Sequence, residues 1–207
     1  MKKNNFWNLF TDNTEKVILL EGARLIKLEE HSQLKNIGSC LRQSLSQCVF
    51  RSGNAIGSDA AFTTGVMEIA STRIEIIVPY STHRLKEIPH NAKVLSLSEL
   101  DSYELSEIKK ISCKANPDRA QLVKLYSPVS KSTLSIKASY LLRDVLKLTG
   151  LPSSNFKPTF VAIFHTKPQT VTGGTFHTMK VCKYLGIPQF HSKDFFIGSS
   201  ENGVITD

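Results

Sequence analysis

Cysteine is scarce in this chain, and its placement excludes the usual cysteine-based frameworks. The four cysteines, Cys40, Cys48, Cys113 and Cys182, form no CxxC pair and no cluster with histidine at zinc-ligand spacing. The six histidines show no metal-ligand spacing either. The sequence therefore predicts neither a disulfide framework nor a metal site, and no cofactor that the protein requires.

Long apolar runs are also missing. The longest, residues 17–20 and 160–164, are far shorter than the roughly 20 residues that span a bilayer. Residues 1–15 carry lysines near the start, but they lack the apolar stretch and the cleavage site of a signal peptide. We therefore expect no membrane segment and a cytoplasmic protein.

Acidic residues are outnumbered by basic ones. The chain has 18 aspartates and glutamates against 26 lysines and arginines, a net charge of +8 over 207 residues. A hydrophobic fraction of 41% is close to that of globular proteins, and the length suits one compact domain. The excess of positive charge favours an anionic partner, and it leaves nucleotide binding, nucleic-acid binding and simple solubility open.

Short β-branched apolar runs alternate with segments of helical periodicity. Strands are predicted over residues 16–22, 48–51, 73–79, 159–164 and 187–190, and helices over residues 32–48, 58–70, 132–149 and 175–185. Because parallel neighbours need helical crossovers, this order predicts an α/β fold with an open, mostly parallel sheet flanked by helices. The weaker pattern of residues 80–116 predicts a variable insertion within a single domain of residues 1–207.

A glycine-rich turn after the second strand is the first candidate site. Gly53 and Gly57 let the backbone approach a ligand closely, and the following helix start offers unpaired N–H groups to a phosphate. Ser52 adds a hydroxyl group, while Asp59 is placed to cap the helix or to hold a ribose hydroxyl. A tight strand-to-helix turn without a ligand explains the same residues equally well.

A second glycine turn precedes the last long helix. Gly173, Gly174 and Thr175 again join a strand to a helix. Because ligands bind at the carboxyl ends of parallel strands, we expect both turns to share one ligand. The alternative is that the glycines only permit a close loop and that Thr175 is a helix cap.

Charged and imidazole side chains near the strand ends are further candidates. Arg24 and Arg51 have the planar guanidinium that binds phosphate with two hydrogen bonds, although surface ion pairs are an equal alternative. His165 and His177 lie near the second turn and are candidates for contacts to a base or ribose. Ordinary polar contacts are the simpler interpretation of both histidines.

The order of these motifs resembles the SLOG superfamily of Rossmann-like domains. The resemblance covers residues 17–190, and the segment 51–62 resembles that family's first phosphate loop in order and spacing. This superfamily includes the DNA-uptake protein DprA, the LOG phosphoribohydrolases and many stand-alone phage and mobile-element proteins. The resemblance implies a Rossmann-like fold, a nucleotide-type ligand, a role for Arg143 beside that ligand, and association into a homodimer.

The second turn departs from the LOG pattern. In LOG hydrolases, the turn that this segment resembles is a Pro-Gly-Gly-x-Gly-Thr-x-x-Glu loop, and its glutamate supports cleavage of an N-glycosidic bond. Here the segment from Thr172 lacks the Gly-Thr that follows the Gly-Gly pair in that loop, and Lys180 stands near the place of that glutamate. An oxocarbenium-like transition state needs a carboxylate, for which Asp59 and Asp144 are the nearby candidates. The departure favours a binding protein and leaves catalysis open.

The predicted function is binding of a nucleotide or nucleotide-derived ligand, as a sensor or a carrier. Two alternatives stay open: a LOG-like phosphoribohydrolase acting on a nucleoside monophosphate, and DprA-like binding of single-stranded DNA. The positive charge favours DNA, but no ladder of basic and aromatic residues accompanies it. The predicted ligand-binding residues are Gly22, Arg24, Arg51, Ser52, Gly53, Ala55, Gly57, Asp59, Arg143, Gly173, Gly174 and Thr175, with His165 and His177 as base or ribose contacts.

Overall fold

The computed structural model describes residues 3–167 and 172–195, and the remaining residues of the predicted domain lie outside this range. Within these residues, six strands form one sheet in the order β4-β3-β2-β1-β5-β6, and every neighbouring pair is parallel. The α/β fold with a parallel sheet is thereby confirmed. The strands are β1 (Val17–Gly22), β2 (Val49–Ser52), β3 (Ile74–Val78), β4 (Lys93–Ser96), β5 (Val161–His165) and β6 (Gln189–His191).

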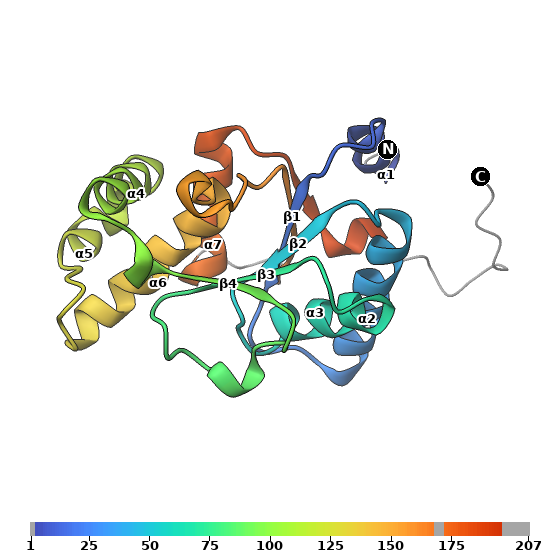
Figure 1. Ribbon diagram of the computed structural model, residues 1–207, viewed down its shortest axis with the longest axis horizontal. Helices are drawn as coiled ribbons and strands as arrows, with labels where there is room; N and C mark the ends of the chain where they lie inside the picture. Colours follow the sequence, from blue (N-terminus) through green and yellow to red (C-terminus); the bar gives the residue numbers. More distant parts are fainter. Residues whose placement is uncertain (1–2, 168–171, 196–207) are drawn as a thin grey trace, which may run out of the picture.

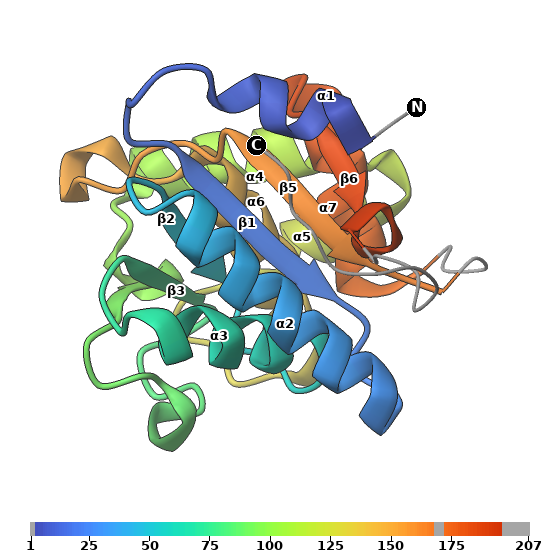
Figure 2. The same cartoon turned by 90° about the vertical axis from the view of Figure 1, so that its right-hand side faces the viewer.

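Helices cover both faces of the sheet, with α2 and α3 on one face and α4 to α7 on the other (Figure 1). Figure 2 shows α2 and α3 lying in front of the central strands. None of the helices in the described ranges is long and apolar enough to cross a membrane. The helices are α1 (Lys3–Trp7), α2 (Leu28–Ser44), α3 (Ser58–Ile69), α4 (Ser102–Ala115), α5 (Ala120–Lys124), α6 (Thr133–Thr149) and α7 (Gly173–Leu185).

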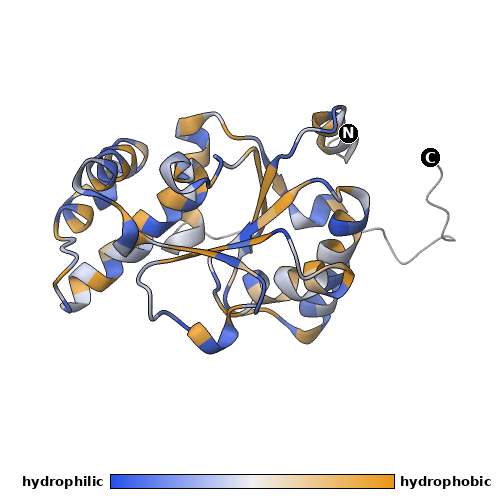
Figure 3. Cartoon of the chain, in the orientation of Figure 1, coloured by the Kyte–Doolittle hydropathy of each residue, from blue (hydrophilic) through white to orange (hydrophobic). Residues whose placement is uncertain are grey.

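The central strands are mostly apolar because both faces of the sheet are buried there. In β1, Leu19 packs with the core under α6, while Ile18 and Leu20 pack with the core under α2 and α3. The alternation follows the two-residue period of a strand. The hydrophobic colouring of the central strands in Figure 3 reflects these two cores.

The segment 80–116, which the sequence predicts to be a variable insertion, contributes to the sheet and to one of its helix layers. It supplies β4, which pairs with β3 as an edge strand, and α4, which packs beside α6 and α7. Leu95, Leu97 and Ile108 of this segment are buried in the core under α6. Only two residues of β4 are buried, so its apolar pattern is too short to mark a strand in the sequence.

Helices α2 and α3 pack with their backbones unusually close. A Cβ atom at Gly65 would lie only 1.8 Å from the carbonyl oxygen of Lys35, and one at Gly38 would lie 2.3 Å from that of Phe62. The hydroxyl of Ser39 donates a hydrogen bond to the carbonyl of Gly65 over 2.9 Å. Glycine at these positions therefore sets how closely α3 lies against α2.

Chain order reverses at β1, since β2 lies on one side of it and β5 on the other. At such a switch point the loops leaving the carboxyl ends of the strands diverge and open a crevice. The loops after β1, β2 and β5 all leave from this edge. The topology therefore predicts where a ligand site should lie.

Candidate functional site

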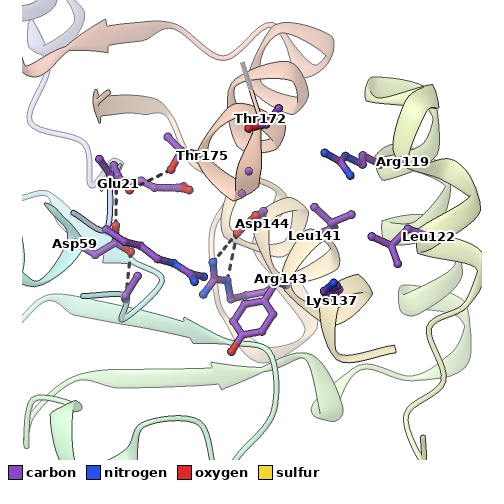
Figure 4. Close-up of a pocket in the computed structure, with 17 residues that line it drawn as sticks. Glu21, Asp59, Arg119, Leu122, Lys137, Leu141, Arg143, Asp144, Thr172 and Thr175 are labelled. Atoms are coloured by element: carbon purple, nitrogen blue, oxygen red, sulfur yellow. Dashed lines mark hydrogen bonds and ion pairs between the residues drawn. The ribbon is translucent and has the colours of Figure 1, made fainter. Parts of the chain in front are cut away.

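A cavity of about 570 Å³ lies at this edge, between the loops after β1 and β2, the middle of α6 and the start of α7. Arg119 and Leu122 close it from the side of α5 (Figure 4). The predicted residues that line it are Gly22, Arg24, Ala55, Asp59, Arg143, Gly173, Gly174 and Thr175. Residues of both glycine turns thus meet at one cavity.

The start of α7 is tied to the end of β1 by side-chain hydrogen bonds. Thr175 donates its hydroxyl to the carbonyl oxygen of Gly22 over 3.1 Å, and Thr178 donates to a carboxylate oxygen of Glu21 over 3.1 Å. Among the residues that the structure describes, no side chain caps the first turn of α7. Thr172 and the first residues of α7 line the cavity, so the positive end of the helix dipole lies at its wall.

Buried charges form a network beneath the cavity. The Lys147 ammonium lies 2.6 Å from Glu21 Oε2 and 2.9 Å from Asp144 Oδ1, and Arg143 Nη2 lies 2.8 Å from the same Asp144 oxygen. Burial would raise the pKa of the Asp144 carboxyl, but Lys147 and Arg143 outweigh burial and lower that pKa to about 2. Burial raises the pKa of the Glu21 carboxyl, against the opposing effect of Lys147. Asp144 is therefore ionised in the folded protein.

Asp59 organises the first glycine turn from within. Its carboxylate accepts hydrogen bonds from the backbone N–H groups of Gly22 and Gly53, each at 3.2 Å, and from that of Ala55 at 3.4 Å. The amides of residues 52–57 are expected to hold a ligand phosphate, and in the structure those of Gly53 and Ala55 donate to the Asp59 carboxylate. Asp59 thus orders the loop by occupying two of these amides.

Ser52 and Gly57 belong to this turn but do not line the cavity. The Ser52 hydroxyl is buried and has no hydrogen-bond partner among the described residues. Gly57 has a φ of +81°, and a Cβ atom there would lie 2.3 Å from the carbonyl oxygen of Arg24. Position 57 therefore requires glycine, because the loops after β1 and β2 approach each other closely there.

Arg51 is placed away from the cavity, contrary to the expectation that it binds phosphate. Its side chain is fully buried, and its Nε donates to Glu75 on β3 over 2.9 Å. Two further donors reach the carbonyl oxygens of Lys147 and Lys157, each over 2.7 Å. Arg51 therefore holds β2, β3 and the end of α6 together.

Both predicted histidines make internal contacts outside the cavity. His165 Nδ1 lies 2.8 Å from the Ser192 hydroxyl, and His177 Nδ1 lies 3.1 Å from the side-chain amide of Asn116. Burial lowers the pKa of each imidazole. They are accordingly buried polar contacts at the ends of β5 and beneath α4, which was the simpler interpretation.

The cavity also contains residues that the sequence did not single out. Lys137 and Tyr140 stand three residues apart on α6, with Arg143 three residues further on, which places them on one helix face. The guanidinium carbons of Arg24 and Arg143 lie 5.8 and 5.3 Å from the centre of the Tyr140 ring. Tyr140 is therefore an aromatic side chain in the cavity with two cations near its ring.

Three cations at the rim are exposed. Arg24, Arg119 and Lys137 come from the loop after β1, the turn before α5, and α6. Among residues 3–167 and 172–195 none of the three forms an ion pair, whereas Arg143 is held by Asp144. The rim of the cavity consequently carries uncompensated positive charge.

The comparisons with known proteins give a likeness in structure. No protein-family model matches the chain, and no curated protein matches it. Among solved structures, the chain is similar to DNA processing protein A from Helicobacter pylori. That structure concerns how DNA processing protein A binds single-stranded DNA. The two share 15% identity and a TM-score of 0.48, over 89% of this chain and 67% of that one. Assigning a ligand to this chain therefore depends on the residues of its own cavity.

Proposed function

We propose that this protein binds a nucleotide or nucleotide-derived ligand in the cavity at the carboxyl edge of the sheet. The observation that carries the proposal is the convergence of Arg24, Arg119 and Lys137, from separate elements, on one cavity, with none of the three in an ion pair with a described carboxylate. Gathering like charges costs free energy unless an anion joins them. A phosphorylated ligand supplies that anion.

The dimensions and surfaces of the cavity support a ligand of nucleotide size. Its volume of about 570 Å³ is in the range of small-molecule sites. The uncapped start of α7 offers N–H groups to a phosphate, and the Tyr140 ring offers a face on which a base stacks. In this arrangement the start of α7 and the cations bind the phosphate, and the base lies against Tyr140.

The chemistry at the cavity favours binding over hydrolysis. Lys180, which stands near the place of the LOG glutamate, donates to Asn116 over 2.9 Å and to Asp118 over 3.2 Å, away from the cavity. Asp59 is engaged by backbone amides, and Glu21 by Lys147 and Thr178. We therefore propose a sensor or carrier, with SLOG membership and a homodimer as parts of the same proposal.

Calorimetric titration of the purified protein with mononucleotides, NAD and ADP-ribose tests this function. We expect one class of nucleotide to bind, and the double variant Arg24→Ala with Lys137→Ala to bind it at least tenfold more weakly. The matched control is Lys114→Ala with Lys183→Ala, which removes two exposed cations outside the cavity and should leave the affinity unchanged.

The same experiment separates the alternatives. Binding of a short single-stranded oligonucleotide with a steep salt dependence, and of no mononucleotide, would favour the DNA alternative. Release of free base from a bound nucleoside monophosphate would favour the phosphoribohydrolase. Equal binding by the cavity variant and its control would show that the cations at the rim do not bind the ligand.

A further inference from the structure

One oxygen of the Asp144 carboxylate has no hydrogen-bond partner, although the residue is fully buried. All the cationic contacts of Asp144 go to Oδ1, which receives Lys147 Nζ at 2.9 Å and Arg143 Nη2 at 2.8 Å. Oδ2 has no hydrogen bond within the described part of the chain. A buried carboxylate oxygen left without a donor is costly, so its persistence calls for an explanation.

Gly174 leaves the space beside this oxygen open. A Cβ atom at Gly174 would lie 3.0 Å from Asp144 Oδ2 and 4.0 Å from Asp144 Cγ, and outside the adjacent residues and the backbone of α7 no other described atom would lie within 4 Å. Both residues line the cavity, and Figure 4 shows Asp144 beside the start of α7. Oδ2 itself is buried from solvent, and the missing side chain at position 174 leaves the space beside it unfilled.

The group that satisfies Oδ2 must donate a hydrogen bond. The carboxylate is ionised because Lys147 and Arg143 lie against it, and an ionised carboxylate only accepts. A ligand phosphate is also an acceptor and carries like charge, so it does not satisfy Oδ2; the cations Arg24, Arg119 and Lys137 and the N–H groups at the start of α7 hold it instead. In a nucleoside 5′-phosphate the sugar is bonded directly to the phosphate, which puts its hydroxyls within reach of the wall beside the phosphate site.

We propose that Asp144 Oδ2 accepts a hydrogen bond from a ribose hydroxyl, and that the site thereby selects ribonucleotides over deoxyribonucleotides. This inference rests on the proposed nucleotide-binding function. It assigns Asp144 to ligand specificity and Gly174 to leaving the space beside the acceptor unfilled. A ligand without the hydroxyl leaves the buried oxygen unpaired in the complex, which is the basis of discrimination.

Titration of the native protein with ribonucleoside 5′-monophosphates and with their 2′-deoxy and 3′-deoxy forms tests the inference without altering the fold. A hydrogen bond to a charged acceptor predicts that loss of the relevant hydroxyl weakens binding on the order of tenfold to a hundredfold. Gly174→Ala, which adds a methyl group 3.0 Å from Oδ2, should bind the ribose and deoxy forms with the same affinity. Lys183→Ala, at the far end of the same helix, should keep the native preference.

The outcomes are distinct. Equal affinity of the native protein for ribose and both deoxy forms would overturn the role of Asp144 while leaving nucleotide binding intact. A preference that follows the exocyclic amine of the base, and not the sugar, would also overturn it, because the donor would then be the base. Absence of binding by every mononucleotide would overturn the proposed function and this inference together.

Discussion

Lys147→Met removes the cation on which the buried network depends. Lys147 is fully buried and neutralises two carboxylates, at 2.6 Å from Glu21 and 2.9 Å from Asp144. Asp144 retains Arg143, whereas among the described side chains Glu21 retains only the Thr178 hydroxyl. Breaking a buried ion pair on one side costs about 3–5 kcal/mol, and Met fills a similar volume, so we expect a loss of that size at pH 8.

The loss should depend on pH. Burial already raises the pKa of Glu21 and Lys147 opposes that rise, so removal of Lys147 raises the pKa further. The folded variant then holds a proton that the unfolded chain releases at high pH, and its stability falls as pH rises. Relative to the native protein, the destabilisation should shrink by up to about 1.4 kcal/mol for each pH unit toward pH 5.

Urea denaturation followed by circular dichroism at pH 5 and pH 8 measures both effects. Lys137→Met is the matched control, because Lys137 is an exposed lysine on the same helix and should change stability by less than about 0.5 kcal/mol. If the free energy of unfolding of Lys147→Met at pH 8 were within about 1 kcal/mol of the native value, the reasoning would be refuted, since a loss of that size is typical of an exposed ion pair.

Two further predictions concern other parts of the fold. His83 has a pKa lowered to about 4 by burial and by Arg143, so stability should be lost as pH falls from 6.5 toward 4, where only the unfolded chain takes up the proton. His83→Phe should reduce that slope in urea denaturation, and an unchanged slope would contradict the assignment. Gly65→Ala should destabilise by about 1–3 kcal/mol despite better helix propensity, because its Cβ would lie 1.8 Å from Lys35. Thr64→Ala, on the exposed face of the same helix, should stay within about 0.5 kcal/mol in the same assay.

The parallel sheet was predictable because its strands are buried on both faces. Continuous apolar segments such as Val17–Gly22 and Val161–His165, separated by helical periodicity, leave few alternatives. The edge strand Lys93–Ser96 has only two buried residues, and its pairing with β3 depends on tertiary contacts that no local pattern encodes. The start of α2 was predicted four residues late, because Leu28 is exposed and the apolar face begins at Leu34.

The site was predictable where it depends on backbone position and less so where it depends on side-chain direction. Gly22, Ala55 and Gly173 line the cavity because loops at strand ends must lie at that edge. Arg51 also stands near a strand end, but its side chain points into the core toward Glu75. A shift of one residue along the strand would place a side chain on the opposite face of the sheet, so its direction depends on the register.

The missed residues differ in the signal that they carry. Glu21 is the only charged side chain in β1, which was a usable indication of a buried partner. Lys137 and Tyr140 share a helix face with Arg143, so their spacing also contained the information. Arg119 lies in a short turn with no periodic pattern, and only the fold brings it to the cavity.

A crystal structure of the protein with the mononucleotide that binds most tightly tests the central claim most directly. We predict density for the ligand in the cavity between the start of α7 and the Tyr140 ring, with phosphate oxygens near Arg24, Arg119 or Lys137 and a sugar hydroxyl within hydrogen-bond distance of Asp144 Oδ2. A nucleotide bound at another surface, with this cavity filled only by solvent, would contradict the account.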